Sequence, residues 1–456
     1  MTALASLLAA ALAASPVRVA APGFGEVAVH APSGAPARVV LLASGAGGLD
    51  PAVADLAAAL AAGGALVVAV DTRAYLSARP AGRCVYPAGD LEALAQHVEK
   101  LQGLASYGRP VVLGHSLGAA LAWAAVANGP AGTFSGAVAV APCPDRPLPV
   151  KLCAPHGAEP RELPGGALPA LAPVPGAAEV VAGADDATCP APAAEGLARA
   201  LAARFTKVPG ASHALSPPLV KAISDAIVRV APPPAARAPA AEDPVASVHD
   251  LPLVEVPSPQ PGRRIALLLT GDGGWVAADK GLAAALAAGS VSVVGLDSLQ
   301  YFWKRRTPAE TARDAARIVA HYRAAWGRDE VLLVGYSRGA DIVPILAALL
   351  PPEERARLVL VAMIGPSTFA ELEVNDIDLF TSKRRANAIG TEAAVRATGG
   401  AVRMICVHGE SERDSLCPKL GDLPWVTDRV HGGGHRLGSS EGAELAREIL
   451  SALPAK

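Results

Sequence analysis

Short runs of β-branched and other apolar residues recur along the chain, separated by longer stretches in which apolar and polar positions alternate with a helical period. Uninterrupted apolar runs of this length are typical of strands buried on both faces of a parallel sheet. Their alternation with helices predicts α/β domains, each a mainly parallel sheet covered by helices on both faces. The predicted strands are Val39–Ala43, Leu66–Val70, Val111–Gly114 and Ala137–Ala141 in the first half, and Ile265–Thr270, Val291–Leu296, Val331–Val334, Leu358–Met363 and Val402–Val407 in the second.

The two halves of the chain repeat one another. "SGAGGL" in the first half corresponds to "TGDGGW" in the second, so that Gly45 pairs with Gly271 at an offset of 226 residues. Ser116 pairs with Ser337 at an offset of 221. Such a small drift over a whole domain predicts an internal duplication with short loop changes.

Each half contains Gly-x-Ser-x-Gly between a predicted strand and a predicted helix, as "GHSLG" around Ser116 and "GYSRG" around Ser337. This sharp turn needs neighbours without bulk and holds the serine hydroxyl above the sheet. The serine needs a histidine to remove its proton and an acid to orient that histidine, in the chain order serine, acid, histidine. The pattern predicts two tandem α/β-hydrolase-like domains.

The second half supplies both partners of Ser337. His435 lies in "VHGGGHRLG", beyond the last predicted strand, and Glu410, Glu412 and Asp414 follow the strand before it. "DATCP" in the first half aligns with "DSLCP", which favours Asp414 as the acid and leaves Glu412 as the reserve. The first half carries the same order as a candidate second site, made of Ser116, Asp186 and His213.

The "TGDGGW" loop is the predicted second half of an oxyanion hole, because glycines let backbone amides approach a substrate closely. Asp272 and Gly273 from this loop and the amide of Arg338 are the candidate donors. Asp272, Trp275, Arg338 and Asp341 are the candidate substrate-binding residues. The first half has Ala46, Leu117 and Ala120 where the second has Asp272, Arg338 and Asp341.

Composition narrows the possible functions. The 456 residues are 51% hydrophobic and 18% charged, which predicts a globular chain, and a net charge of −2 without a long basic tract argues against nucleic acid as a partner. A short apolar stretch, Leu4–Leu12, predicts a signal peptide over residues 1–21 and export to the periplasm. A Pro/Ala-rich linker is expected over 231–257, between domains at 22–230 and 258–456, with no transmembrane span.

The six cysteines favour disulfides over metal, because an even number in an exported chain is typical of a disulfide framework. Cys406 and Cys417 are the only two in the second half and form the predicted pair. Three pairings remain open for the other four, Cys84, Cys143, Cys153 and Cys189. No metal or cofactor is expected.

Several motifs together resemble one family. "GDGGW", "YFW" followed by "RTP", "GYSRGAD", "DSLCP" and "GGGH" are similar to the VirJ/AcvB family of bacterial periplasmic proteins, and "RCVYPAGDLE" resembles the N-terminal domain of its longer AcvB-type members. The resemblance implies an exported serine esterase that hydrolyses lysyl- or alanyl-phosphatidylglycerol at the membrane surface. It implies Ser337 as nucleophile, His435 as general base and an acid near Asp414.

Two other functions remain open at this stage. A general periplasmic carboxylesterase or lipase would use the same triads, and a non-catalytic factor for type IV secretion, with secretion-system proteins as partners, would keep only the fold. The charged surroundings of Ser337, including the basic run Lys304–Arg306, favour a substrate with both an ammonium and a phosphate group.

Overall fold

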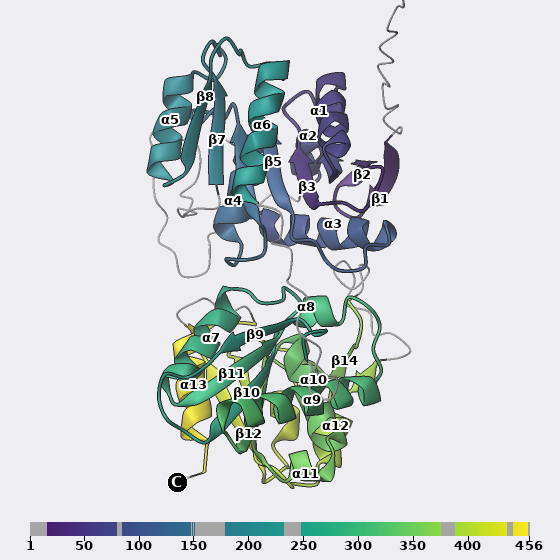
Figure 1. Cartoon of the computed structure of the whole chain (residues 1–456), viewed down its shortest axis with the longest axis vertical. Coiled ribbons are helices and arrows are strands. Elements are labelled where there is room, and N and C mark those ends of the chain that lie inside the picture. Colours follow the sequence, from purple (N-terminus) through teal and green to yellow (C-terminus); the bar gives the residue numbers. More distant parts are fainter. Residues whose placement is uncertain are drawn as a thin grey trace, which may run out of the picture. The chain divides into compact units, whose positions relative to one another are not determined.

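The computed structural model describes residues 16–79, 84–146, 148, 150, 178–231, 248–374, 388–435 and 441–454. The chain divides into two compact units (Figure 1). The first comprises Met1–Gln102, Gly108–Gly129 and Phe134–Ala235, and the second Gly103–Tyr107, Pro130–Thr133 and Ala236–Lys456. Most of the predicted signal peptide and much of the predicted linker lie outside the described residues.

The first unit is built on an eight-stranded sheet in the order β1-β2-β4-β3-β5-β6-β7-β8. The strands from β4 to β8 in this order run parallel, while β2 is antiparallel to both β1 and β4. The bounds are β1 Val17–Ala21, β2 Gly25–His30, β3 Arg38–Ala43, β4 Ala65–Val70, β5 Val111–His115, β6 Gly136–Val140, β7 Ala178–Gly183 and β8 Arg204–Val208.

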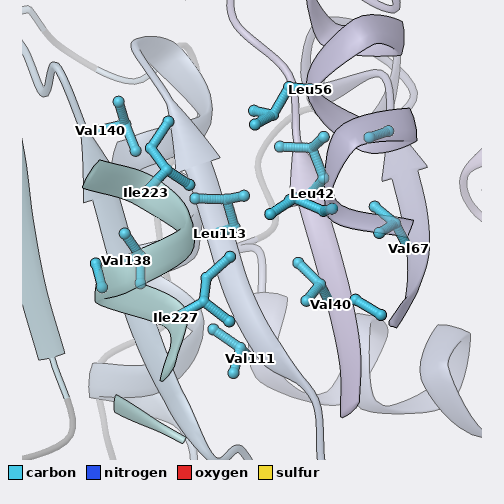
Figure 2. Packing of buried hydrophobic residues seen from close by; sticks show 14 of the residues in the cluster. Val40, Leu42, Leu56, Val67, Val111, Leu113, Val138, Val140, Ile223 and Ile227 are labelled. Atoms are coloured by element: carbon cyan, nitrogen blue, oxygen red, sulfur yellow. The ribbon is translucent and has the colours of Figure 1, made fainter. Parts of the chain in front are cut away.

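Helices cover both faces of this sheet. On one face Leu56 of α1 and Ile223 and Ile227 of α6 join a core formed with the central strands, where Figure 2 shows the two isoleucines beside Leu113 of β5. On the other face α4 and α5 pack through Trp123 and neighbouring small residues. The bounds are α1 Pro51–Ala62, α2 Thr72–Ser77, α3 Pro87–Leu101, α4 Leu117–Asn128, α5 Ala191–Ala200 and α6 Pro217–Val230.

The second unit repeats this plan with a seven-stranded sheet in the order β17-β16-β13-β12-β10-β11-β9. The strands from β17 to β11 are parallel, and β9 runs antiparallel to β11 at the edge, as β2 does to β4 in the first unit. A short antiparallel pair, β14 with β15, stands apart. The bounds are β9 Leu253–Val256, β10 Arg264–Leu269, β11 Val291–Leu296, β12 Glu330–Tyr336, β13 Leu358–Ile364, β14 Phe369–Ala370, β15 Ile389–Gly390, β16 Met404–Gly409 and β17 Val426–His431.

The helices of the second unit also form two layers (Figure 1). Leu286 of α7 and Ile449 of α13 bury one face of the sheet, and α9 and α10 pack on the other. The bounds are α7 Ala277–Ala288, α8 Ser298–Tyr301, α9 Pro308–Trp326, α10 Arg338–Leu349, α11 Pro352–Arg355, α12 Thr391–Ala397 and α13 Glu441–Ser451, with a 3-10 helix at Cys417–Leu420. All nine predicted strands are therefore confirmed, and the fold is that of two α/β-hydrolase-like units.

One glycine in each unit sets how closely the helix after the serine approaches the sheet. A Cβ atom on Gly118 would lie 2.2 Å from the carbonyl oxygen of Ala43, and one on Gly339 would lie 2.1 Å from that of Leu269. No side chain fits in that space, so the second glycine of each Gly-x-Ser-x-Gly motif is required for packing.

A disulfide in each unit ties down one loop, the loop after β7 in the first unit and the loop after β16 in the second. The predicted pair Cys406–Cys417 is confirmed, with its Cα atoms 5.4 Å apart. Among the other cysteines, Cys143 is bonded to Cys189, and Cys84 is also disulfide-bonded. Cys153 lies outside the described residues. Among the described helices, none has both the length and the apolarity of a membrane span.

Candidate active site

Ser337 sits at a strained turn between β12 and α10. Its backbone has φ 52° and ψ −118°, in a region that non-glycine residues seldom occupy, and its amide donates a hydrogen bond of 2.8 Å to the carbonyl of Ile364. Such a conformation costs on the order of 1–3 kcal/mol and persists only when the surroundings enforce it. The turn presents the serine hydroxyl at the carboxyl end of the sheet.

A chain of two hydrogen bonds runs from Ser337 through His435 to Glu412. The Ser337 Oγ lies 2.8 Å from His435 Nε2, and His435 Nδ1 lies 2.5 Å from Glu412 Oε1. The backbone carbonyl of His435 accepts a hydrogen bond of 3.1 Å from the hydroxyl of Tyr336, which directly precedes the serine. This geometry is suited to a histidine that removes the serine proton while a carboxylate holds its ring in place.

His435 and Glu412 each stabilise the charged form of the other. The hydrogen bond to Glu412 raises the pKa of His435 above its ordinary 6.5 against the opposing effect of burial, and the Asp272 carboxylate acts in the same direction. Burial works to raise the pKa of Glu412, but the hydrogen bonds from His435 and from the Gly409 amide outweigh it, so this pKa is lowered. Glu412 is therefore a carboxylate at neutral pH, able to stabilise a protonated His435.

The preference for Asp414 as the acid is wrong, because the structure brings Glu412 against His435 and leaves Asp414 exposed. Which residue acts as the acid depends on the number of residues between it and the end of the preceding strand. Glu412 is three residues beyond Gly409, the last residue of β16, and its amide bonds to that glycine's carbonyl at 3.0 Å. Asp414 lies two residues further along the loop.

The first unit shows why aligning the loop cysteines pointed to Asp414 instead of Glu412. Asp186 is likewise three residues beyond Gly183, the last residue of β7, and its amide bonds to that carbonyl at 3.4 Å. Asp186 thus corresponds to Glu412 at the offset of 226 that also relates the glycine loops. The second unit has two more residues between this position and the loop cysteine, so matching the cysteines shifted the acid.

Two backbone amides are available as oxyanion donors beside Ser337. A Cβ atom on Gly271 would lie 3.2 Å from the Cβ of Ser337, so the glycine loop passes directly over the serine. Within the described part of the chain, the amides of Asp272 and Arg338 donate to no backbone or side-chain acceptor. Amides placed in this way can stabilise negative charge that develops on a carbonyl oxygen. Gly273, the remaining predicted donor, is partly exposed in the same loop.

The guanidinium of Arg338 is paired and hydrogen-bonded within the protein. Its guanidinium pairs with the carboxylate of Asp272 and donates to the carbonyls of Glu371 and Glu373 at 2.7 and 3.0 Å. Only 10% of this side chain is exposed, against 48% for Asp272. The guanidinium thus links the glycine loop to the segment around residue 372, and its contact with substrate stays a prediction.

The carboxylate of Asp341 is also hydrogen-bonded within the protein. Its two carboxylate oxygens accept hydrogen bonds from the amide and the hydroxyl of Ser367, at 2.6 and 3.0 Å. Burial raises its pKa to about 8, although the bonds from Ser367 oppose the shift. The structure thus gives Asp341 a partner within the protein, and its role in substrate binding stays a prediction.

Trp275 belongs to the core rather than to the site. It is 7% exposed and packs with the residues under α7 and α13. A Cβ atom on Gly295 would lie 2.2 Å from its ring, which shows that the indole fills the space left by that glycine. The substrate-binding role of Trp275 stays a prediction, and Asp272 is the one member of that predicted set with a half-exposed charged group.

The first unit brings its own predicted residues together in a similar way. Ser116 has φ 54° and ψ −113°, and His213 Nδ1 lies 2.9 Å from Asp186 Oδ2. His115 takes the place of Tyr336, because its Nε2 lies 2.9 Å from the backbone carbonyl of His213. The bond between serine and histidine differs, since none joins Ser116 to His213 in the described structure.

One group of described side chains has metal-ligand spacing. Atoms of Asp186, Cys189 and His213 all lie within 4.8 Å of one another. Cys189 is in a disulfide with Cys143, so its sulfur is not a thiolate ligand here.

Each half of the chain matches a known family model. Residues 263–456 match the family model described as bacterial virulence protein (VirJ), and residues 37–159 match the alpha/beta hydrolase fold. The chain has the two-domain arrangement of the VirJ/AcvB family. The residues that match the VirJ model include Ser337, His435 and Glu412. Ser116 lies within the residues that match the hydrolase fold.

Several solved structures are similar to about half of the chain. An alpha-beta serine hydrolase homologue from Coxiella burnetii and TT1662 from Thermus thermophilus are each 18% identical, with a TM-score of 0.33, covering 47% of this chain and 97% of their own. Est1E from Butyrivibrio proteoclasticus is 12% identical, with a TM-score of 0.33, covering 47% of this chain and 98% of its own. No curated protein matches the sequence.

Proposed function

We propose that the chain is an exported serine esterase that hydrolyses the aminoacyl ester of lysyl- or alanyl-phosphatidylglycerol, releasing the free amino acid and phosphatidylglycerol. The observation that carries this proposal is the Ser337–His435–Glu412 chain, with hydrogen bonds of 2.8 and 2.5 Å, beside a half-exposed carboxylate on Asp272. The three hydrogen-bonded side chains supply the chemistry of ester hydrolysis, and the Asp272 carboxylate supplies a partner for an amino group.

The reaction follows from the contacts. Ser337 Oγ attacks the ester carbonyl while its proton passes to His435 Nε2, and the amides of Asp272 and Arg338 stabilise the negative oxygen. The C–O bond to the lipid glycerol then breaks, and the lipid hydroxyl leaves with the proton from His435. Water hydrolyses the aminoacyl-serine by the same steps in reverse, with Glu412 stabilising the protonated His435 each time.

Asp272 is the proposed contact for the α-ammonium of the aminoacyl group. Its backbone amide and its carboxylate belong to one residue, so an acyl carbonyl held by the amide would have its α-substituent within reach of the carboxylate. Arg338 neutralises part of this charge and fixes the carboxylate in place, while 48% of the Asp272 side chain stays exposed. A fixed carboxylate at a partly buried site favours a cation there.

A basic run beside the site supports an anionic lipid. Lys304 and Arg305 are exposed, and the amide of the next residue, Arg306, bonds to the Leu372 carbonyl at 2.9 Å. The carbonyls of Glu371 and Glu373, on either side of Leu372, hold the Arg338 guanidinium. The basic run is thus connected to the serine turn through one short segment, where it can meet a phosphodiester or a negatively charged membrane surface.

Disulfides support the proposed location outside the cytoplasm. Cys143–Cys189 and Cys406–Cys417 are both formed, and such bonds persist mainly in oxidising compartments such as the periplasm.

The test is amino-acid release from vesicles that contain lysyl- or alanyl-phosphatidylglycerol, with wild-type protein and the variants Ser337→Ala and Ser116→Ala. Release that is lost in Ser337→Ala and kept in Ser116→Ala supports the proposal. If the wild type releases no amino acid but hydrolyses simple esters, the protein is a general esterase. If it hydrolyses neither, a non-catalytic role in secretion replaces the enzyme.

A further inference from the structure

The first unit holds the parts of a second serine-hydrolase site. Ser116 follows the carboxyl end of β5, and Asp186 follows that of β7. These strands run parallel in one sheet, so their carboxyl ends meet at the same edge. The VirJ domain accounts for none of these residues, since its family match begins at residue 263.

Apart from the bond between serine and histidine, the reactive groups of this set are arranged as in the second unit. Ser116 has the same left-handed backbone as Ser337, with φ 54° against 52°. Asp186 engages the Nδ1 atom of His213 at 2.9 Å, which leaves Nε2 for the serine proton. His115 holds the backbone carbonyl of His213 at 2.9 Å, so the histidine is fixed at its ring and at its main chain.

Oxyanion donors are also present. A Cβ atom on Gly45 would lie 3.6 Å from the Cβ of Ser116, so the glycine loop passes beside this serine as well. The amides of Ala46 and Leu117 donate to no acceptor within the residues that the structure describes. Two free amides beside a serine can receive a developing oxyanion.

Ala141 gives a physical reason for the missing bond between Ser116 and His213. Its amide bonds to the Val181 carbonyl at 2.8 Å, as that of Gly365 does to Val407. A Cβ atom on Gly365 would lie 3.0 Å from the His435 ring, which is tighter than usual. Ala141 carries such a methyl group, with φ 46°, at the position where it would press on the His213 imidazole and keep it from the serine.

The surroundings of Ser116 differ from those of Ser337 in charge. Ala46, Leu117 and Ala120 stand where the second unit has Asp272, Arg338 and Asp341, and all three are at least partly exposed. The nearby carboxylate of Asp50 caps α1 through a bond of 2.9 Å from the Val53 amide. Methyl and isobutyl groups around a serine favour an apolar acyl group and offer no partner for an ammonium.

We propose that the first unit is a second esterase site, in which Ser116, His213 and Asp186 hydrolyse esters whose acyl group is uncharged and apolar. Ser116 Oγ attacks the carbonyl and its proton passes to His213 Nε2. The ester C–O bond breaks, and the alcohol leaves with that proton. Water then attacks the acyl-serine, gives its proton to His213, and releases the carboxylic acid as Ser116 is protonated again.

An alkyl fluorophosphonate tests this site in the full chain. In Ser337→Ala, peptide mapping is expected to find the probe on Ser116, and p-nitrophenyl butyrate hydrolysis is expected to persist. Adding Ser116→Ala, or His213→Asn, should lower that hydrolysis at least 100-fold. Ser212→Ala, at an exposed serine next to His213, is the matched control and should retain the activity of Ser337→Ala.

Two further arms test specificity and the role of Ala141. Ser337→Ala should prefer p-nitrophenyl butyrate over lysine p-nitrophenyl ester, and Ser116→Ala should show the opposite preference. Ala141→Gly in the Ser337→Ala background should raise the rate several-fold, because the imidazole can close on the serine.

The proposal is overturned if Ser116 carries no probe in folded Ser337→Ala and in wild type. It is equally overturned if butyrate hydrolysis does not depend on Ser116. Thermal melting of each variant separates lost chemistry from lost folding, and mapping the wild type needs no substitution. Neither outcome depends on lipid hydrolysis by Ser337, so failure of one site is distinguishable from failure of the other.

Discussion

The hydroxyl of Tyr336 donates a hydrogen bond of 3.1 Å to the backbone carbonyl of His435. The residue before Ser337 thereby holds the main chain of the histidine that is hydrogen-bonded to the serine. The loop of His435 is rich in glycine, so a fixed point at this residue limits the positions its ring can take.

Tyr336→Phe removes this bond and keeps the ring. We expect kcat to fall about fivefold, since a single hydrogen bond contributes about 1 kcal/mol. Ester hydrolysis by the purified protein measures the effect. Tyr322→Phe is the control, because it removes a hydroxyl on α9 that is bonded at 2.8 Å to Glu255 of the edge strand β9, three places away from β12 in the sheet. Equal losses in both variants would mean that Tyr336 acts only through stability.

Glu412→Gln should lower kcat by on the order of 10²–10⁴-fold, because His435 loses the charge that stabilises its protonated form. Asp414→Asn changes the same charge two residues away, on an exposed side chain, and should leave kcat unchanged. Steady-state kinetics on one ester compare the two directly. A larger loss in Asp414→Asn would restore the acid that the cysteine alignment favours.

The dependence of activity on pH should report His435. The base must be neutral to accept the serine proton, so kcat/KM rises with pH through the pKa of His435. Glu412 raises that pKa above 6.5, which puts the midpoint above 6.5 in the wild type. Removing the negative charge in Glu412→Gln should move the midpoint of the residual activity downward. An unchanged or higher midpoint would contradict the assigned contact.

Asp272→Asn tests the partner of the substrate ammonium. Asparagine keeps an oxygen for Arg338 and keeps the backbone amide, but it loses the negative charge. We expect kcat/KM for lysyl-phosphatidylglycerol to fall about tenfold or more, with little change for p-nitrophenyl acetate in the Ser116→Ala background. Equal losses on both esters would assign Asp272 to the oxyanion loop alone.

The two described disulfides should differ in their contribution to stability. Cys406 and Cys417 are 11 residues apart, and Cys143 and Cys189 are 46 apart. Loop-closure entropy then predicts that replacing each pair by serines lowers the free energy of unfolding by about 3 and about 4 kcal/mol. Denaturant unfolding of the two double variants measures both values. A smaller loss for the longer loop would contradict the entropic account.

The buried part of the fold could be predicted from the sequence, and its edges could not. Strands such as Val331–Val334 are continuous apolar runs because both faces of the sheet are covered. β17, Val426–His431, is mostly exposed, and β9, Leu253–Val256, pairs on one side only, so neither shows that signal. Edge strands depend on a neighbour that the local sequence does not reveal.

The serine and histidine of the site were predictable because chain order and glycine spacing define them. The roles of the charged residues were not, because their partners lie far away in sequence. Arg338 is held by carbonyls 33 and 35 residues later, and Asp341 by Ser367, 26 residues later. A charge near a nucleophile thus looks available to substrate until tertiary structure shows which groups satisfy it.

The left-handed backbone at Ser116 bears on the history of the first unit. A glycine at this position would adopt φ 54° without strain and would leave the fold more stable. A unit retained only as scaffolding would gain from that replacement, since selection would no longer favour the hydroxyl. Serine nevertheless occupies the turn, so the first unit still bears a conformational penalty that only the proposed second site would require.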